Sequence, residues 1–252
     1  MKILICIDDT DNKESKGTGQ LAAALSDRIR KRGWGEGGGI TRHQLFVHPD
    51  VPYTSHNSAM CFPFTVANDQ VGSLISLARA FLAEHGAPGS DPGLCVVDRA
   101  ALAATDTEAL IAFGKSAKSS VLRKQDALVL AQQLGIHLSE NGGTGDGVIG
   151  ALAGVGLRLS GNDGRFRGHY PLGDPGQQLA VAEIKARTPV EVVRALDGTR
   201  LSDDDPVALG PKVKAVLLGH TCTLLVFRPE RARGSNTPSP WHTCSKEQLR
   251  SY

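Results

Sequence analysis

Three carboxylates follow directly on a short apolar run at the start of the sequence. The run covers residues 2–7 (KILICI) and predicts a buried strand, and the acidic residues after it are Asp8, Asp9 and Asp11. Carboxylate oxygens at the carboxyl end of a strand suit Mg²⁺, which binds a few carboxylates together with phosphate oxygens and waters. We therefore expect these three residues to be catalytic and to hold the metal. The residues alone fit an ordinary acidic loop equally well.

Two glycines flank a threonine a few residues later. Gly17, Thr18 and Gly19 begin a helical pattern that extends to about residue 32. Exposed backbone N–H groups at a helix N-terminus favour phosphate. Thr18 fits two roles at this position, a helix cap and a nucleophile or phosphate contact, and from the residues alone capping is the better explanation.

A glycine-rich segment in the middle of the sequence is the strongest local signal. Residues 141–147 (NGGTGDG) precede an apolar helical run over 148–156. Several backbone N–H groups at a helix N-terminus predict a phosphate cradle. The spacing does not fit the dinucleotide-binding fingerprint. A turn that allows close helix packing is the alternative.

Other chemistry-bearing segments are less specific. The proline-containing loop over 48–58 offers His48, Ser55 and Asn57 as hydrogen-bond partners for a ligand, although it also fits a plain turn. The basic stretch from Lys115 to Lys124 favours a solvated helix face over a contact with RNA backbone. Two His-Thr-Cys segments, at 220–222 and 242–244, fit coincidence better than a zinc site.

The elements that must position these residues follow a recognisable order. Apolar patterns predict strands at 2–7, 40–48, 59–66 and 94–98, and helices at 18–32 and 70–84. This strand–helix–strand–strand–helix–strand order is typical of the ferredoxin-like, split βαβ arrangement. We therefore expect an α/β (α+β) protein with a ferredoxin-like βαββαβ region over residues 1–100. A second α/β domain with the Gly-rich loop is expected over 101–230, and a tail over 231–252.

Within the second domain, the patterns predict helices at about 105–117 and 121–134. A short hairpin is expected over 156–170, and late strands at about 213–218 and 222–228. The tail is rich in Arg, Ser, Pro and Thr, which predicts a disordered or thinly packed segment.

Composition limits the class of protein. The chain has 252 residues, of which 40% are hydrophobic and 21% charged, and its net charge is 28 − 26 = +2. These values exclude disorder, collagen-like repeats and a coiled coil for the whole chain. The sequence contains no apolar stretch of about 18 residues, so we expect no membrane span. Five cysteines, an odd number mostly inside apolar runs, indicate reduced thiols and a cytoplasmic protein.

Three segments, in the same order, resemble the archaeal 2-agmatinylcytidine synthetase (TiaS) family, which modifies an isoleucine tRNA. They are residues 7–18 with the IDDTD run and Gly17-Thr18, residues 49–57 (PDVPYTSHN), and residues 145–156 (GDGVIGALAGVG). The sequence departs from the family at Gly17-Thr18-Gly19, where the family has Cys-Thr-Thr. It also contains no Cys-x-x-Cys pair of the kind found in the family's zinc ribbon, which grips tRNA together with an OB-fold domain.

The resemblance implies an ATP- and Mg²⁺-dependent kinase-like core joined to a ferredoxin-like domain. In that reading the three aspartates hold Mg²⁺ and the ATP phosphates, and Thr18 accepts a phosphoryl group. Residues 141–147 help to cradle the nucleotide. The full set of expected nucleotide contacts is Thr10, Gly17, Gly19, Asn57, Gly142, Gly143, Thr144, Gly145 and Asp146.

The sequence therefore predicts an ATP-dependent phosphoryl- or adenylyl-transfer enzyme whose acceptor is RNA, a small amine or a nucleoside-like molecule. Two alternatives remain open. One is a nucleic-acid-binding module without turnover, which requires a basic face such as Arg28–Arg32 or Lys115–Lys124 along the cleft. The other is a sensor that binds ATP without using it.

Overall fold

The chain divides into two compact units, Met1–Ser160 (unit 1) and Gly161–Tyr252 (unit 2). A computed structural model describes residues 1–51, 57–229 and 239–252. The expected domain boundary near residue 100 is therefore not where the chain divides. The helices and the strand between residues 104 and 160 pack onto the sheet built by residues 1–100, so both segments share one core.

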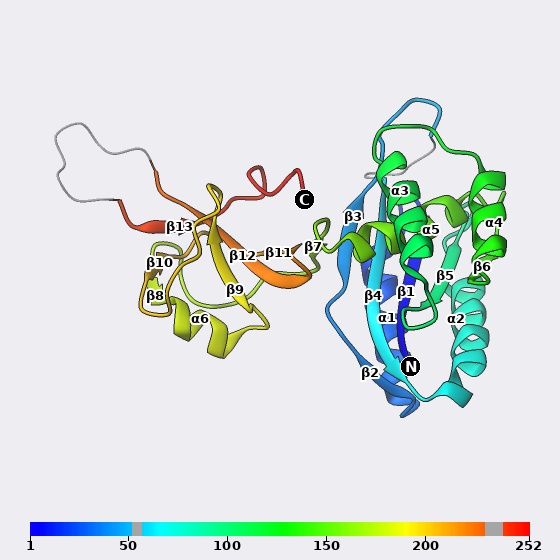
Figure 1. The fold of residues 1–252 in the computed structure, drawn as a ribbon, viewed down its shortest axis with the longest axis horizontal. Coiled ribbons are helices and arrows are strands. Elements are labelled where there is room, and N and C mark those ends of the chain that lie inside the picture. The colour runs from blue at the N-terminus through cyan, green and yellow to red at the C-terminus, as the bar shows by residue number, and fades with distance from the viewer. Residues whose placement is uncertain (52–56, 230–238) are drawn as a thin grey trace. The chain divides into compact units, whose positions relative to one another are not determined.

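Unit 1 contains a sheet in the order β6-β5-β1-β4-β3, and β2 pairs with β4 beside β3 (Figure 1). Strand β1 lies between β4 and β5 and is antiparallel to both. The order β5-β1-β4-β3 is the split βαβ arrangement expected from the sequence. The strands are β1 (Lys2–Asp8), β2 (Gly35–Gly37), β3 (Thr41–Gln44), β4 (Ser58–Val66), β5 (Gly93–Asp98) and β6 (His137–Glu140).

Helices cover both faces of this sheet. Ile3, Ile5 and Ile7 of β1 face α1 and α2, whereas Leu4 and Cys6 face the opposite layer, as the two-residue period of a strand requires. The bounds are α1 (Thr18–Lys31) and α2 (Val71–His85), which follows the short 3-10 turn η1 (Asn68–Gln70), on one face, and α3 (Ala104–Ser116), α4 (Lys124–Gln133) and α5 (Gly147–Ser160) on the other.

Helix α5 is the most buried helix of unit 1, with little of its surface left to solvent. Small residues let it approach the sheet closely. A Cβ atom on Gly154 would lie 2.5 Å from the Cys6 sulfur, and one on Gly150 would overlap the Asp8 carboxylate. The opening of α5 therefore lies directly against the end of β1.

Unit 2 is built around β12. This strand pairs with β11 and β13 in antiparallel fashion and with β9 in parallel. The bounds are β7 (Arg165–Phe166), β8 (Gln178–Ala180), α6 (Val181–Arg187), β9 (Val192–Ala195), β10 (Pro206–Ala208), β11 (Ala215–Leu218), β12 (Thr221–Phe227) and β13 (Trp241–Thr243).

Several expectations for the second half of the chain need correction. The two late strands are confirmed as β11 and β12, but residues 156–160 continue α5 and form no hairpin. Part of the expected loose tail is ordered, because Trp241, Cys244 and Leu249 are buried in unit 2. All five cysteines are free thiols. No helix in the described segments is long and apolar enough to cross a membrane.

Candidate active site

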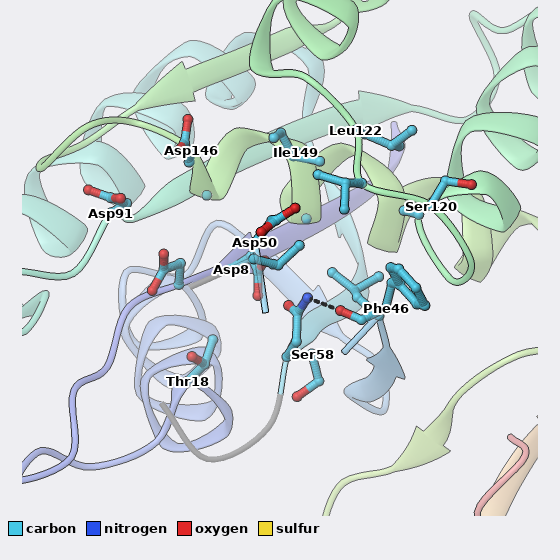
Figure 2. Close-up of a pocket in the computed structure, with 18 of the residues that line it drawn as sticks. Asp8, Thr18, Phe46, Asp50, Ser58, Asp91, Ser120, Leu122, Asp146 and Ile149 are labelled. Carbon is cyan, nitrogen blue, oxygen red and sulfur yellow. Dashed lines mark hydrogen bonds between the residues drawn. The ribbon is translucent and has the colours of Figure 1, made fainter. Parts of the chain in front are cut away.

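A cleft opens at the carboxyl end of β1 and contains about 890 Å³ of space, counting the part open to solvent. Figure 2 shows Asp91 and Asp146 at one end of it and Phe46, Ser120 and Leu122 at the other, with Asp8 and Asp50 between them. One end is thus acidic and the other largely apolar. The carboxylates that line it are Asp8, Asp9, Asp11, Asp50, Asp91 and Asp146, and the apolar wall comprises Leu45, Phe46, Val51, Val121, Leu122 and Ile149.

Asp8 and Asp9 are the innermost carboxylates. Burial, together with the neighbouring Asp9 charge, raises the pKa of Asp8 to about 8. Burial and the charges of Asp91 and Asp11 raise the pKa of Asp9 to about 6. Asp9 also has a left-handed backbone with φ of 48°, which non-glycine residues rarely adopt and which is common at functional sites. These features indicate carboxylates whose ionised forms are disfavoured here, a cost that proton uptake or a bound cation relieves.

Thr18 is 6% exposed and lines the cleft from the first turn of α1. Its hydroxyl donates a 2.6 Å hydrogen bond to the Asp11 carboxylate. Gly17, not Thr18, is the N-cap residue of α1, and as a glycine it has no side chain to form a capping hydrogen bond. The capping explanation for Thr18 is therefore wrong, because its hydroxyl is paired with a carboxylate in the cleft.

Two further sequence-predicted residues line the cleft. They are Asp146, just before α5, and Asn57. The Asn57 side chain donates a 2.7 Å hydrogen bond to the Phe46 carbonyl oxygen, which fixes the chain around the apolar end (Figure 2). Thr10 is buried beside the site, and its hydroxyl has no hydrogen-bond partner among the residues that the structure describes.

The remaining predicted nucleotide contacts are not cleft-lining residues; they are Gly17, Gly19, Gly142, Gly143, Thr144 and Gly145. In the 141–147 loop, the Thr144 N–H and hydroxyl both donate to the Asp91 carboxylate. Gly142, Gly143 and Gly145 have positive φ angles, and a side chain on Gly143 would overlap Asp91. This favours the close-packing interpretation of the glycines over that of a free phosphate cradle.

Sequence reasoning missed Asp91 and most of the apolar wall, and it named the loop over 48–58 without assigning roles to Asp50 and Ser58. Asp91 lies two residues before β5, which pairs with β1, so its loop ends beside Asp9. The only available signal was an aspartate in the turn-rich run 86–93, just before a predicted buried strand. Nothing local distinguishes it from a solvent-exposed turn residue.

The carboxylates that line the cleft are ligands of the kind that a magnesium ion accepts. Within the described residues, no three His, Cys, Asp or Glu side chains are grouped to hold a metal ion by themselves. Mg²⁺ does not require such a group, because it is usually held by one or two carboxylates plus substrate phosphates and waters. Of these carboxylates, Asp9 is the best placed to bind Mg²⁺, because the charges of Asp11, Asp91 and Asp146 all act on it.

The close approach of α5 to Asp8 gives a testable stability effect. Gly150→Ala places a methyl group against the Asp8 carboxylate, and we expect it to destabilise unit 1 by about 1–3 kcal/mol through overpacking. Gly72→Ala in α2 is the matched control, because nothing lies within 4 Å of its Cβ position. That change should be neutral or stabilising by up to about 1 kcal/mol. Denaturant unfolding measures both, and a Gly150→Ala protein as stable as Gly72→Ala would contradict the packing described.

Comparison with known proteins finds similar proteins for part of the chain. No protein-family model matches it. The curated tRNA 2-agmatinylcytidine synthetase TiaS of Archaeoglobus fulgidus is 33% identical over 164 aligned positions, and the alignment covers 63% of this chain and 36% of that protein. The chain therefore spans little more than a third of that relative's length, and the aligned stretch is about as long as unit 1.

Solved structures give the same result. A tRNA fluorescent labelling enzyme matches with a TM-score of 0.53 and 31% identity, over 62% of this chain and 36% of the other. A complex of TiaS with tRNA and ATP matches with a TM-score of 0.54 and 29% identity, and one of TiaS with tRNA, AMPCPP and agmatine with 0.52 and 29%. Each of these two TiaS matches covers 62% of this chain and 36% of the TiaS chain. The chain thus carries a TiaS-like α/β core, as the sequence resemblance predicts.

Proposed function

We propose that the cleft binds ATP with Mg²⁺ and transfers a phosphoryl or adenylyl group, with Thr18 as the first acceptor. The observation that carries this proposal is the 2.6 Å hydrogen bond from the Thr18 hydroxyl to Asp11 at the edge of the acidic cleft. A hydroxyl bonded to a carboxylate has a base ready to take its proton. The likeness to TiaS, of which a complex with ATP is known, supports ATP as the ligand of the cleft.

The two ends of the cleft suit the two halves of ATP. Leu45, Phe46 and Leu122 offer apolar surface to the base. The N-termini of α1 and α5 lie at the acidic end, where their dipoles favour phosphate oxygens. Asp8 and Asp9 would hold Mg²⁺, which neutralises charge on the transferred group.

The chemical step then balances without another reactant. The Thr18 oxygen attacks a phosphorus atom of ATP, its proton passes to Asp11, and the bond from that phosphorus to the leaving group breaks. Attack at the terminal phosphorus releases ADP, whereas attack at the first releases pyrophosphate. The group on Thr18 then passes to an acceptor. TiaS complexes hold tRNA and agmatine, so RNA or a small amine are the acceptor classes we favour.

The nucleic-acid module without turnover is less well supported by the cleft. None of its described lining residues is Lys, Arg or His. Arg30 of the first basic stretch pairs with Asp27, and Lys124 of the second pairs with Glu140. These cations are engaged on the surface of unit 1 and do not form the basic cleft wall that this alternative requires.

The same lack of basic side chains predicts that ATP binding depends strongly on a divalent cation. With excess EDTA replacing Mg²⁺, we expect ATP affinity to fall by at least about 30-fold, because the triphosphate would face carboxylates alone. Calorimetric titration measures this, and adenosine, which has no phosphate, is the control whose affinity should not change. Equal ATP affinity in EDTA would contradict the proposed phosphate position.

Product-resolved ATP turnover with Mg²⁺ tests the function itself. ADP or AMP among the products, together with a modified Thr18 in the peptide mass spectrum, would support the enzyme. Binding without any product or modification would favour a sensor. Absence of both binding and turnover would overturn the nucleotide proposal.

A further inference from the structure

Asp91 makes a two-point contact that joins two distant loops at the acidic end of the cleft. One carboxylate oxygen accepts a 2.5 Å hydrogen bond from the Thr144 backbone N–H. The other accepts a 2.6 Å hydrogen bond from the Thr144 hydroxyl. We call this pair of hydrogen bonds the Asp91–Thr144 clasp. Both oxygens of the carboxylate are therefore used by one residue of the glycine-rich loop.

The glycine-rich loop is held on its other side as well. The Lys124 ammonium donates a 2.7 Å hydrogen bond to the Thr144 carbonyl oxygen and lies 2.8 Å from the Glu140 carboxylate. The Asn141 N–H donates to the Pro92 carbonyl oxygen at 2.9 Å. Every backbone and side-chain polar group of Thr144 thus has a partner within the protein, and the loop acts as a fixed support.

The same residue also reaches the innermost carboxylates. The Asp91 backbone N–H lies close enough to the Asp9 carboxylate to lower its pKa. Through its side chain, Asp91 holds Thr144, which is two residues before Asp146 and three before the start of α5. One short segment therefore fixes the distance between Asp9 on one side of the cleft and Asp146 with the α5 N-terminus on the other.

We propose that Asp91 is a positioning residue that sets this acidic end for the metal–triphosphate part of a nucleotide. This inference rests on the proposed function. In this proposal Asp91 acts through Thr144 and Asp9, since both of its oxygens accept short hydrogen bonds from Thr144. Groups that orient ligands in this way typically change metal affinity by about 10–100-fold when removed.

Three variants separate positioning from direct ligation. Asp91→Asn keeps an oxygen for the Thr144 N–H and an amide that can donate to the Thr144 hydroxyl, so it retains the clasp and loses the charge. We expect Mg-ATP affinity in calorimetry to stay within about 3-fold of wild type in Asp91→Asn. It should fall about 10-fold in Asp91→Ala and about 3-fold or more in Thr144→Val, which loses one of the two bonds. If Asp91→Asn loses as much affinity as Asp91→Ala while Thr144→Val loses none, Asp91 is a direct ligand and the proposal is wrong.

Hydrogen exchange without nucleotide gives a second measurement that does not depend on the proposed function. The Thr144 amide should exchange at least about 10-fold faster in Asp91→Ala than in wild type, and at a near wild-type rate in Asp91→Asn. Asp50→Ala is the matched control, since Asp50 lines the same cleft without contacting Thr144, and it should leave this amide unchanged. Unchanged exchange in Asp91→Ala would overturn the clasp even if ATP binds. Faster exchange in a protein that binds no ATP would overturn only the proposed function.

Discussion

Thr18→Ala is expected to abolish covalent modification of the protein by Mg-ATP and to lower ATP turnover by at least about 10³-fold. The alanine removes the only atom of residue 18 that can attack phosphorus, and Asp11 loses the proton it is placed to accept. ATP affinity should stay within about 3-fold of wild type, because the proposed contacts to base and phosphates come from other residues. Phosphopeptide mapping, product-resolved turnover and calorimetry measure the three quantities.

Thr18→Ser is the matched control for this prediction. It keeps the hydroxyl and its path to Asp11, so turnover should remain within about 10-fold of wild type. If Thr18→Ala turns ATP over normally, Thr18 is not the first acceptor, and water or the final acceptor attacks the ATP phosphorus directly. If neither wild type nor variant turns ATP over while both bind it, the chain is a nucleotide sensor.

The part of the site next to β1 could be predicted because it is local in sequence. A buried apolar run must end where polar residues begin, so Asp8 and Asp9 had to lie at a strand end. Thr18 and Asp11 are seven residues apart in one connection, and the helical period marked the start of α1 correctly. The split βαβ order followed from the same patterns, since each strand and helix carried its own periodicity.

Residues that reach the site through strand register could not be predicted. Asp8 pairs with Gly93 across β1 and β5, and Gly93 pairs with Glu140 across β5 and β6. These two registers bring Asp91 and the 141–147 loop to Asp9. Strand β6, a half-exposed stretch with one clear apolar residue, gave no strand signal, so the loop had no predictable neighbour.

The burial of α5 determines where the boundary between the two units lies. Its sequence is apolar on all sides (VIGALAGVGL), which requires cover all around the helix. The sheet covers one side through Gly150 and Gly154, and α3 covers another through the close contact of Gly156 with Leu110. A helix of this kind lies in the middle of a core, so a boundary before it at residue 100 would have split that core.

The burial of Asp8, together with the neighbouring Asp9 charge, predicts that removing the Asp8 charge stabilises the protein. The folded-state pKa of about 8 lies above the ordinary value of 3.8, so folding at pH 4–8 requires Asp8 to take up a proton. The resulting loss of folding free energy is absent near pH 4, grows between pH 4 and pH 8, and is constant above pH 8. Asp8→Asn is isosteric and bears no charge, and its amide oxygen can still accept from the Asp9 N–H.

We therefore expect Asp8→Asn to match wild type near pH 4 and to be more stable by a few kcal/mol at pH 8–9, given about 1.4 kcal/mol per pKa unit. The melting temperature of unit 1 should rise on the order of 5–10 °C there. Hydrogen exchange of the β1 amides measures the stability of unit 1 alone. Asp27→Asn, at an exposed carboxylate on α1, is the control and should change stability by less than about 0.5 kcal/mol.

Mg-ATP should narrow the difference in stability between Asp8→Asn and wild type, because a bound cation favours the ionised Asp8 that only wild type has. An Asp8→Asn protein that is no more stable than wild type at pH 8–9 would mean that Asp8 is not held against its charge, and the argument for a cation at this end of β1 would lose its electrostatic basis.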